Sequence, residues 1–464
     1  MNFKVLLNTT MLLLYTATIK IKKTMKSKML FTSLLLLSAI VSSYSQLLDK
    51  GKLDQLFDKL AEKNKAMGTL LINKDSKAMY GRSIGYEYIN GAEKKPLTMS
   101  TRYRIGSITK MFTAVMIYQL IEEGKLKLTD HLDKFYPQLP NASKITIEHI
   151  LSHRSGITGP NMEQQFASRR FTGITKDDML AALAQGKPEF EPGEKYAYSN
   201  AGYFILGNII EKTGKQSYEK ALQQRVVSKI GLKDTYAATA DIDVNKNESF
   251  SFKYYADWKQ EPVTHHSFLF GSGFIVSTVA DLAKFIEALF SGKLITQQHL
   301  DLMIKLQSGM DSFTYNGKTF YGHTGGVDGF GTWLAYLPEE KLTFSYATNG
   351  KVYPVGKIMD HISDAYYNKP FDIPSFETLE ISTETLDKYV GVYGLTDAPV
   401  KFTVKRDGNK LLIEMTGRPA FAVEPIAEDK FKIDTPPLEF HFDVAKKQMT
   451  FKRPGGERVF TKEN

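Results

Sequence analysis

The sequence contains no cysteine. This absence excludes disulfide bonds, thiol catalysis, thiolate-bound metal ions and a lipid anchor on an N-terminal cysteine. Acidic residues are missing from the first 45 positions, which carry six lysines. Without these six lysines the formal net charge falls from +9 to +3. The basic balance therefore comes mainly from the N-terminus and gives no support for nucleic-acid binding.

A long apolar run of transmembrane length is also missing near the N-terminus. The run Met29–Val41 is too short to span a bilayer comfortably. It follows Lys26 and Lys28 and precedes Ser43-Tyr-Ser45, an order typical of an export signal that is cleaved before Gln46. We therefore predict that residues 1–45 are an export signal whose start is over-extended, and that the protein is periplasmic or secreted. The alternative is an uncleaved segment that anchors the chain to the inner membrane.

The rest of the chain, 464 residues in all and 42% hydrophobic, is long enough for more than one domain. Helical spacing over 47–65, a hairpin over 68–86, helices over 125–230 and strand patterns over 318–347 predict an α+β domain at residues 46–368. Proline-containing residues 369–384 are predicted to be a linker. Residues 385–464 contain short strand patterns up to Lys452 with turns about every 8–12 residues, which predicts a small antiparallel barrel, with a sandwich as the alternative.

One segment combines a serine and a lysine at helical spacing. Ser107 and Lys110 are three residues apart, and the positions from Met111 to Ile121 are apolar almost all round. This composition predicts a buried helix with both side chains on its first turn, where unpaired N–H groups and the dipole favour negative charge. A serine hydroxyl becomes a nucleophile when a base removes its proton, and a lysine of lowered pKa can be that base.

Two further motifs carry groups that could complete such a site. Tyr198-Ser-Asn200 lies in a predicted loop directly before a predicted helix. A tyrosine near cations is expected to lose its proton more readily and to relay it, and the asparagine can donate to a substrate carbonyl. His323-Thr324-Gly325-Gly326 lies on a predicted strand. Its glycines would let a substrate lie against the backbone, and a strand N–H could help to hold an oxyanion.

Each motif has a second match that is better explained by local structure. Ser217-Tyr-Glu-Lys220 opens an amphipathic pattern, as a helix N-cap does. Tyr88-Ile-Asn90 lies in a predicted hairpin and is interpreted as a turn. Lys212-Thr-Gly214 falls at a predicted helix end, where glycine is a C-cap.

In chain order, Ser107-x-x-Lys110, Tyr198-x-Asn200 and His323-Thr-Gly325 resemble the three motifs of the penicillin-recognising serine hydrolases. Leu151–Gly156 and Gly271–Asp281 support the resemblance, which covers about residues 50–370. The tyrosine resembles the class C β-lactamase branch, which includes D-alanyl-D-alanine carboxypeptidases, D-aminopeptidases and esterases.

The resemblance implies a β-lactamase-like antiparallel sheet with flanking helices, an all-helical subdomain and an appended small β-barrel. It also implies that Ser107 is acylated while Lys110 and Tyr198 share proton transfer. Asn200, His323, Thr324, Gly325 and Gly326 would bind substrate, with the N–H groups of Ser107 and Gly326 forming an oxyanion hole.

One position departs from the family pattern, because His323 replaces the lysine of the β-lactamase third motif. A histidine is charged only in part near neutrality, so it is a weaker partner for a substrate carboxylate. This substitution disfavours efficient β-lactam hydrolysis and favours esters or D-amino-acid amides.

The expected function is therefore an exported serine hydrolase that cleaves an ester or amide of a small molecule or peptide. The alternatives are a penicillin-sensor-like protein that is acylated without turnover and an inactive scaffold. The sequence predicts no cofactor, no metal site, no nucleic-acid partner and membrane contact only during export.

Overall fold

The computed structural model describes residues 48–157, 167–255, 257–376, 379–395, 397–417, 420–433 and 437–463. The predicted export signal at residues 1–45 lies outside this part of the chain. Over the described residues, none of the helices has the length and apolar character needed to cross a membrane.

The first domain is built on an eight-stranded sheet. Its main path is antiparallel and runs in the order β10 (Asp311–Tyr315), β11 (Lys318–Val327), β12 (Phe330–Leu337), β13 (Leu342–Lys351), β1 (Ala66–Lys74) and β2 (Lys77–Ile84). The short strands β7 (Phe252–Tyr254) and β8 (Trp258–Gln260) branch from β13. The sheet thus brings the beginning of the domain against its end, with Leu70 of β1 opposite Tyr346 of β13.

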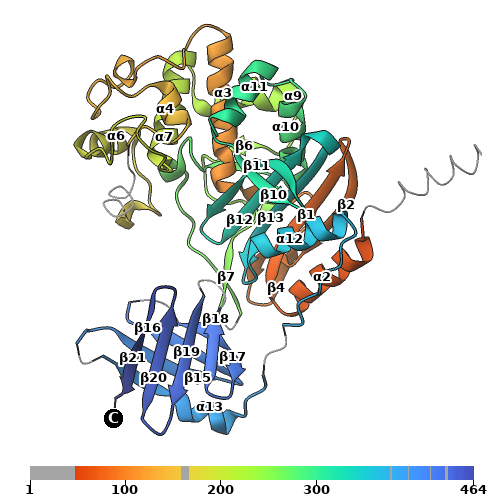
Figure 1. The fold of residues 1–464 in the computed structure, drawn as a ribbon, viewed down its shortest axis with the longest axis vertical. Helices are drawn as coiled ribbons and strands as arrows, with labels where there is room; N and C mark the ends of the chain where they lie inside the picture. The colour runs from red at the N-terminus through yellow and green to blue at the C-terminus, as the bar shows by residue number, and fades with distance from the viewer. Residues whose placement is uncertain are drawn as a thin grey trace, which may run out of the picture.

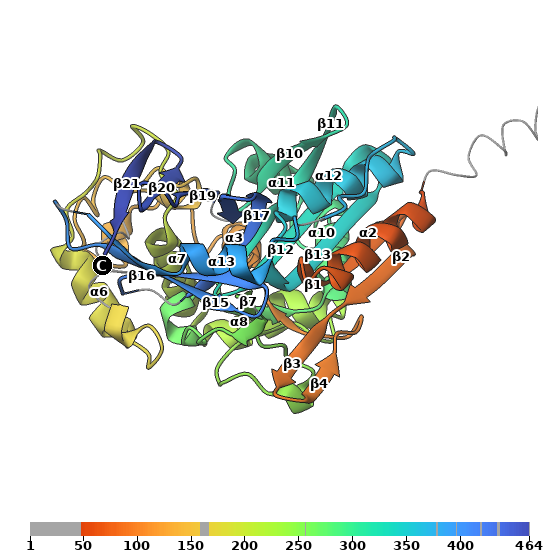
Figure 2. The same ribbon diagram turned by 90° about the horizontal axis from the view of Figure 1, so that it is seen from below.

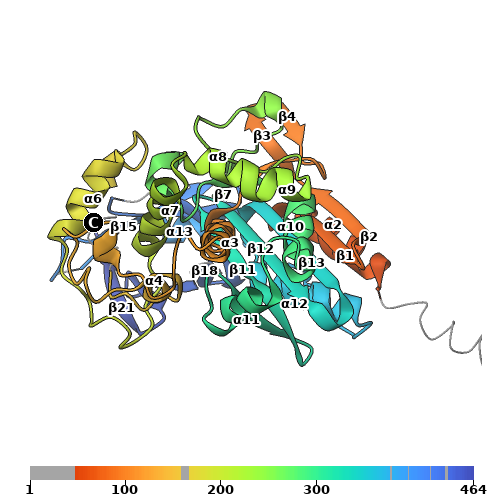
Figure 3. The same cartoon turned by 90° about the horizontal axis from the view of Figure 1, so that it is seen from above.

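Helices cover both faces of this sheet, as the views in Figures 1 and 3 show. Helices α2 (Lys50–Glu62) and α12 (Val355–Tyr366) pack on one face, and α10 (Val279–Phe290) packs on the other. Because both faces are covered, the central strands β1 and β13 are buried along nearly their whole length. The polar residues of β13, such as Thr343 and Ser345, are therefore buried together with its apolar ones.

Helix α3 (Thr109–Glu122) is the centre of the helical part of the domain. Figure 3 shows it end-on between the sheet and α7 (Asn200–Gly214). Residues Thr109 to Leu120 are all buried, as the all-round apolar composition predicted. The other helices of this part are α4 (Ile147–Leu151), α6 (Lys176–Gln185), α8 (Tyr218–Leu222), α9 (Ser228–Ile230) and α11 (Gln297–Lys305).

Three local expectations need correction. Ser107 lies in a 3₁₀ turn, Gly106–Ile108, that precedes α3 rather than in the first α-helical turn. Tyr88-Ile-Asn90 belongs to strand β3 (Tyr86–Asn90), which pairs with β4 (Glu93–Pro96), and is not itself the turn. Gly214 is still helical, and Lys215 takes the left-handed cap conformation with φ +50°. Ser217 is a helix N-cap as predicted, because its side chain accepts from the Lys220 N–H.

The C-terminal domain is a closed antiparallel barrel of eight strands. They are β14 (Gly391–Gly394), β15 (Lys401–Asp407), β16 (Lys410–Met415), β17 (Phe421–Ala427), β18 (Lys430–Ile433), β19 (Leu438–Asp443), β20 (Gln448–Arg453) and β21 (Gly456–Lys462). The barrel alternative was therefore correct and the sandwich was wrong. The strand patterns recognised in the sequence stopped at Lys452 and missed β21, which closes the barrel by pairing with β14.

The barrel lies beside the first domain, as Figure 1 shows, and in Figure 2 it lies in front of that domain. Polar contacts between the described parts of the two domains include an ion pair between Lys65 and Glu424 and a hydrogen bond of 3.3 Å from Lys410 Nζ to the Tyr254 hydroxyl. Helix α13 (Thr383–Tyr389) leads into β14 and buries Leu386 and Tyr389 in the barrel core.

Candidate active site

The turn that carries Ser107 is pressed against strand β11. Gly106 has φ +52°, and a Cβ atom on it would lie 2.6 Å from the backbone N of Gly326. A Cβ on Gly325 would lie 1.9 Å from the carbonyl oxygen of Ile105. Only glycine fits at either position, because a side chain would separate the two segments. This close approach places the Gly326 N–H beside the Ser107 turn.

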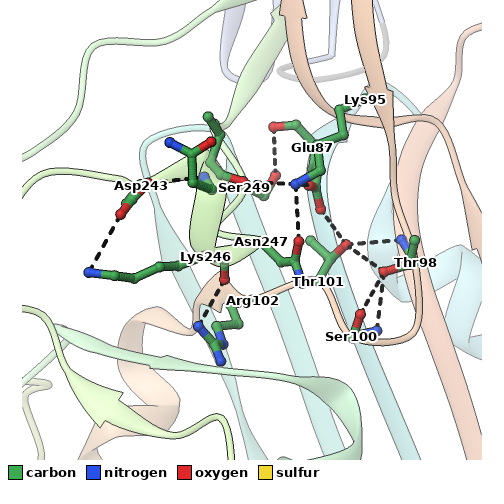
Figure 4. Close-up of polar contacts among 12 residues, drawn as sticks. Glu87, Lys95, Thr98, Ser100, Thr101, Arg102, Asp243, Lys246, Asn247 and Ser249 are labelled. Carbon is green, nitrogen blue, oxygen red and sulfur yellow. Dashed lines mark hydrogen bonds and ion pairs between the residues drawn. The ribbon is translucent and has the colours of Figure 1, made fainter.

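The chain that enters this turn is tied down by the polar cluster shown in Figure 4. The carboxylate of Glu87, 1% exposed, accepts from the Thr101 hydroxyl at 2.6 Å and pairs with Lys95 Nζ at 2.7 Å. Arg102 donates to the Lys246 carbonyl at 2.8 Å, and Lys95 donates to Asn247 at 3.0 Å. Residues immediately before strand β5 (Tyr103–Arg104) are thus held on both sides, which fixes the position of the serine turn.

Lys110 is fully buried with its amine at the serine. Its Nζ lies 3.1 Å from Ser107 Oγ and donates to the Ser272 carbonyl at 2.8 Å. Burial lowers the pKa of the Lys110 amine well below its usual value, and the Asp311 carboxylate acts in the opposite direction. The effect of burial on the pKa is larger than that of Asp311, so the neutral amine, which can accept the serine proton, is stabilised.

Tyr198 reaches the same place from the loop before α7. Lys110 Nζ lies 4.8 Å from the centre of its ring. Desolvation of the phenol group raises the pKa of Tyr198, although 46% of the residue is exposed and interaction with the Ser107 hydroxyl opposes the effect. The expected lowering of this pKa by nearby cations is therefore wrong in direction, because desolvation of the phenol group outweighs the effects that lower the pKa. Burial also disfavours the charged form of Lys110. The phenol stays protonated and can donate a hydrogen bond.

His153 holds the loop that carries Tyr198 in place. Its Nδ1 accepts from the Ser199 N–H at 3.0 Å, and its carbonyl accepts from the Ala197 N–H at 2.8 Å. The imidazole stacks on the Tyr198 ring with 4.6 Å between ring centres. Burial lowers the pKa of His153 to about 3, so the ring is neutral and can accept at Nδ1. These contacts make His153 a structural residue that positions Tyr198.

The third motif, His323 to Gly326, lies on β11, against the turn that carries Ser107. His323 is 4% exposed, and its ring centre lies 6.4 Å from that of Tyr198. Burial lowers the pKa of His323, while Asp311, with Oδ2 3.7 Å from His323 Nε2, raises it. Thr324 and Gly325 are half-buried, and Gly326 is exposed, so this edge of the strand is open to a ligand.

The structure therefore brings together Ser107, Lys110, Tyr198 and the residues His323 to Gly326. Asn200 is placed differently. It is the first residue of α7 and is exposed, and its side chain makes no hydrogen bond with the described residues. It lies two positions after Tyr198 but is not part of the network around the lysine.

Two residues at this site were not singled out from the sequence. Ser272, whose carbonyl accepts from Lys110, lies inside the Gly271–Asp281 segment, which was noted only as a supporting match. Asp311 stands at the first position of β10, opposite Gly322 of β11. No local pattern marks it, because its role depends on strand pairing. In the described part of the chain, histidine and acidic side chains form no group of three or more that could hold a metal ion.

The antiparallel sheet, the buried helix and the serine–lysine pair at its start define the class as a serine hydrolase of the β-lactamase and penicillin-binding protein superfamily. The Beta-lactamase family model matches residues 53–368, and the chain belongs to that family.

Similarity to some known proteins extends beyond this domain. Penicillin-binding protein 4* of Bacillus subtilis is 25% identical over 430 residues, which cover 84% of this chain and 93% of that protein. The octameric penicillin-binding protein homologue from Pyrococcus abyssi has a similar structure, with a TM-score of 0.62 and 25% identity over 89% of this chain and 100% of that one. D-amino acid amidase from Ochrobactrum anthropi shares the fold, with a TM-score of 0.60 and 20% identity over 68% of this chain and 98% of that one.

Proposed function

We propose that the protein hydrolyses an ester or amide of a small molecule or peptide through an acyl-enzyme on Ser107. One observation carries the proposal: a fully buried amine of lowered pKa lies 3.1 Å from the hydroxyl of a half-buried serine. A serine needs a base within hydrogen-bond reach to attack a carbonyl, and Lys110 meets this requirement.

The proposed reaction has two halves. Neutral Lys110 takes the Ser107 proton as Oγ bonds to the substrate carbonyl carbon, and the resulting oxyanion lies between the N–H groups of Ser107 and Gly326. Collapse of this intermediate breaks the bond to the leaving group. The Tyr198 hydroxyl donates a proton to the leaving group and takes in its place the proton held by Lys110. Water then loses a proton to the Lys110–Tyr198 pair and attacks the acyl carbon, which releases the acid and restores Ser107.

The substrate we propose carries a neutral or cationic group, rather than a carboxylate, next to the scissile bond. His323 is held mainly neutral by burial, so it offers little positive charge to an anion. The carboxylate of Asp311, whose side chain is 42% exposed, lies beside it and would attract an ammonium group. Esters and amides of D-amino acids with a free amine fit this arrangement better than penicillins or peptides with a terminal carboxylate.

The first experiment compares Ser107→Ala with Ser217→Ala in hydrolysis of p-nitrophenyl acetate. Ser217 is a matched control, because it also begins a Ser-x-x-Lys sequence but acts as a helix N-cap. We expect Ser107→Ala to lose at least about 10³-fold in kcat/KM and Ser217→Ala to keep its kcat/KM within about twofold. Full activity of Ser107→Ala would overturn the proposal.

The alternative function, acylation without turnover, requires a separate measurement. A fluorescent penicillin is added to the wild-type protein, and the adduct is followed by mass spectrometry after free reagent is removed. A Ser107 adduct that persists for hours, together with absent ester turnover, favours the sensor function. We further propose that the protein is exported, which a comparison of the mature N-terminus with residues around Gln46 in the periplasmic or secreted fraction would test.

A further inference from the structure

The two ends of the barrel differ, because helix α13 covers one of them and leaves the other open. Helix α13 closes the end where β14 begins, and its Tyr389 packs on Phe431 and Phe442 with ring centres 5.5 and 4.8 Å apart. A cavity of about 500 Å³ lies at the other end, where β14 and β20 end and β21 begins. That volume is within the range of small-molecule sites, about 300–1,000 Å³.

Apolar side chains form the inner wall of this cavity. Its lining includes Leu395, Phe402, Met415, Phe451 and Phe460. The Phe402 ring lies 5.1 Å from that of Phe451 and 4.8 Å from that of Phe460. An eight-stranded barrel is just wide enough either to be filled by side chains or to hold one small ligand. Here a cavity of about 290 Å³, lined in part by Lys388, Tyr393 and Phe442, lies at the α13 end, and the larger and more aromatic cavity lies at the other end.

Two arginines line the mouth of the cavity from the same inner face. Met449 is fully buried in the core, so Phe451 and Arg453 follow it inward at every second position of β20. On β21 the buried Phe460 places Arg458 on the inner face in the same way. Phe451 is directly opposite Arg458, and both arginines line the cavity.

Neither arginine has an acidic partner among the described residues, and Glu457, at the same rim, pairs with Lys452 at 3.2 Å. Arg453 is opposite Gly456, so Arg458 is its diagonal neighbour across the β20–β21 pair. Two like charges at such positions repel each other, and a bound anion would relieve that repulsion. A pair of guanidinium groups above an aromatic floor suits a ligand that is apolar at one end and anionic at the other.

We propose that the open end of the barrel binds an amphipathic organic anion. The apolar body of the ligand fills the cavity against Phe402, Phe451 and Phe460, and its carboxylate or phosphate pairs with Arg453 and Arg458. This site uses no residue of the Ser107 site and does not depend on the proposed hydrolase activity.

The test is isothermal titration of the full chain with dodecanoate, dodecyl phosphate and dodecanol, each below the concentration at which it forms micelles. We expect one saturable site for an anion and at least about tenfold weaker binding of the alcohol, since a charge-assisted hydrogen bond is lost. The stronger of the two anions identifies the head group.

The decisive variant is Arg453→Gln combined with Arg458→Gln. It should bind the preferred anion at least about tenfold more weakly and keep the wild-type thermal unfolding profile, which shows that it is folded. Lys405→Gln combined with Lys446→Gln removes two exposed barrel lysines and should bind like the wild type. Absence of saturable binding, equal binding of dodecanol, or unchanged affinity of the double arginine variant would each overturn the proposal; the last result would place the ligand elsewhere.

Discussion

At the scale of single residues, the protonation of Lys110 sets the working pH range. Only the neutral amine can accept the serine proton, so activity should fall as the pH drops through the pKa of Lys110. Burial lowers that pKa well below the usual lysine value, whereas Asp311 raises it. The acid limb of the pH–kcat/KM profile should therefore lie below the usual range of a lysine.

Removal of the Asp311 charge provides the test of this balance. In Asp311→Asn the influence that raises the pKa of Lys110 is absent, so the acid limb should move to lower pH. The pH dependence of kcat/KM for p-nitrophenyl acetate, an ester without charge, measures this shift. Asp257→Asn is a control at an exposed carboxylate paired with Lys259. If the acid limb of the Asp311→Asn profile keeps the wild-type position or moves to higher pH, Asp311 does not raise the pKa of Lys110.

The same variant separates pH effects from substrate choice. On a D-amino-acid p-nitroanilide with a free amine, loss of the carboxylate should raise KM by about tenfold, the worth of one charge-assisted contact. The N-acetylated analogue has no ammonium group, so its KM should hardly change. Equal effects on both compounds would show that Asp311 does not contact the amine.

At the scale of elements, the site depends on backbone contact between the Gly106–Ile108 turn and β11. In Gly325→Ala, a Cβ atom would lie 1.9 Å from the Ile105 carbonyl oxygen, which the structure cannot accommodate without moving one segment. We expect destabilisation of about 1–3 kcal/mol and a fall in kcat larger than the rise in KM, because the oxyanion contact is disturbed. Gly317→Ala, at a turn with open space around it but a φ of +75°, controls for backbone strain alone.

Much of this arrangement was accessible from the sequence, because it depends on patterns within single elements. The all-round apolar run after Lys110 predicted the buried helix. The glycines after His323 were expected to let a substrate lie against the backbone, and the contact of Gly325 with the Ile105 carbonyl was not predicted. The elements that were missed depend on partners elsewhere. Asp311 matters only because β10 pairs with β11, and β21 becomes a strand by completing the barrel against β14. The direction of the Tyr198 pKa shift was misjudged because local desolvation of the phenol, in a residue that is 46% exposed overall, cannot be read from a loop sequence.

At the scale of the whole molecule, the barrel is joined to the first domain through Lys65. This lysine is 4% exposed, its ion pair with Glu424 crosses the domain boundary, and its carbonyl accepts from the N–H groups of Val352 and Tyr353 at 2.9 Å. In Glu424→Gln the buried ammonium loses its charged partner, which should cost about 1–3 kcal/mol of stability. Thermal unfolding of the full chain measures the loss.

The matched control for this change is Glu414→Gln, which breaks an exposed barrel pair with Lys405 at 2.9 Å and should alter stability by less than about 1 kcal/mol. Lys65→Met in the Glu424→Gln background removes the unpaired charge and should recover part of the loss. If Glu424→Gln and Glu414→Gln have the same melting temperature, the ion pair between the domains contributes no more to stability than an exposed surface pair.

The pairing of β1 with β13 also constrains how the protein can be made. Leu70 finds Tyr346 as its neighbour only after almost the entire first domain has left the ribosome. Until then β1, which is buried along nearly its whole length in the folded protein, has β2 on one edge and no strand on the other. Contacts so distant in sequence form slowly, so we expect the sheet to close only late in the synthesis of the polypeptide. A chain whose sheet has not yet closed can still be passed through a narrow translocation pore.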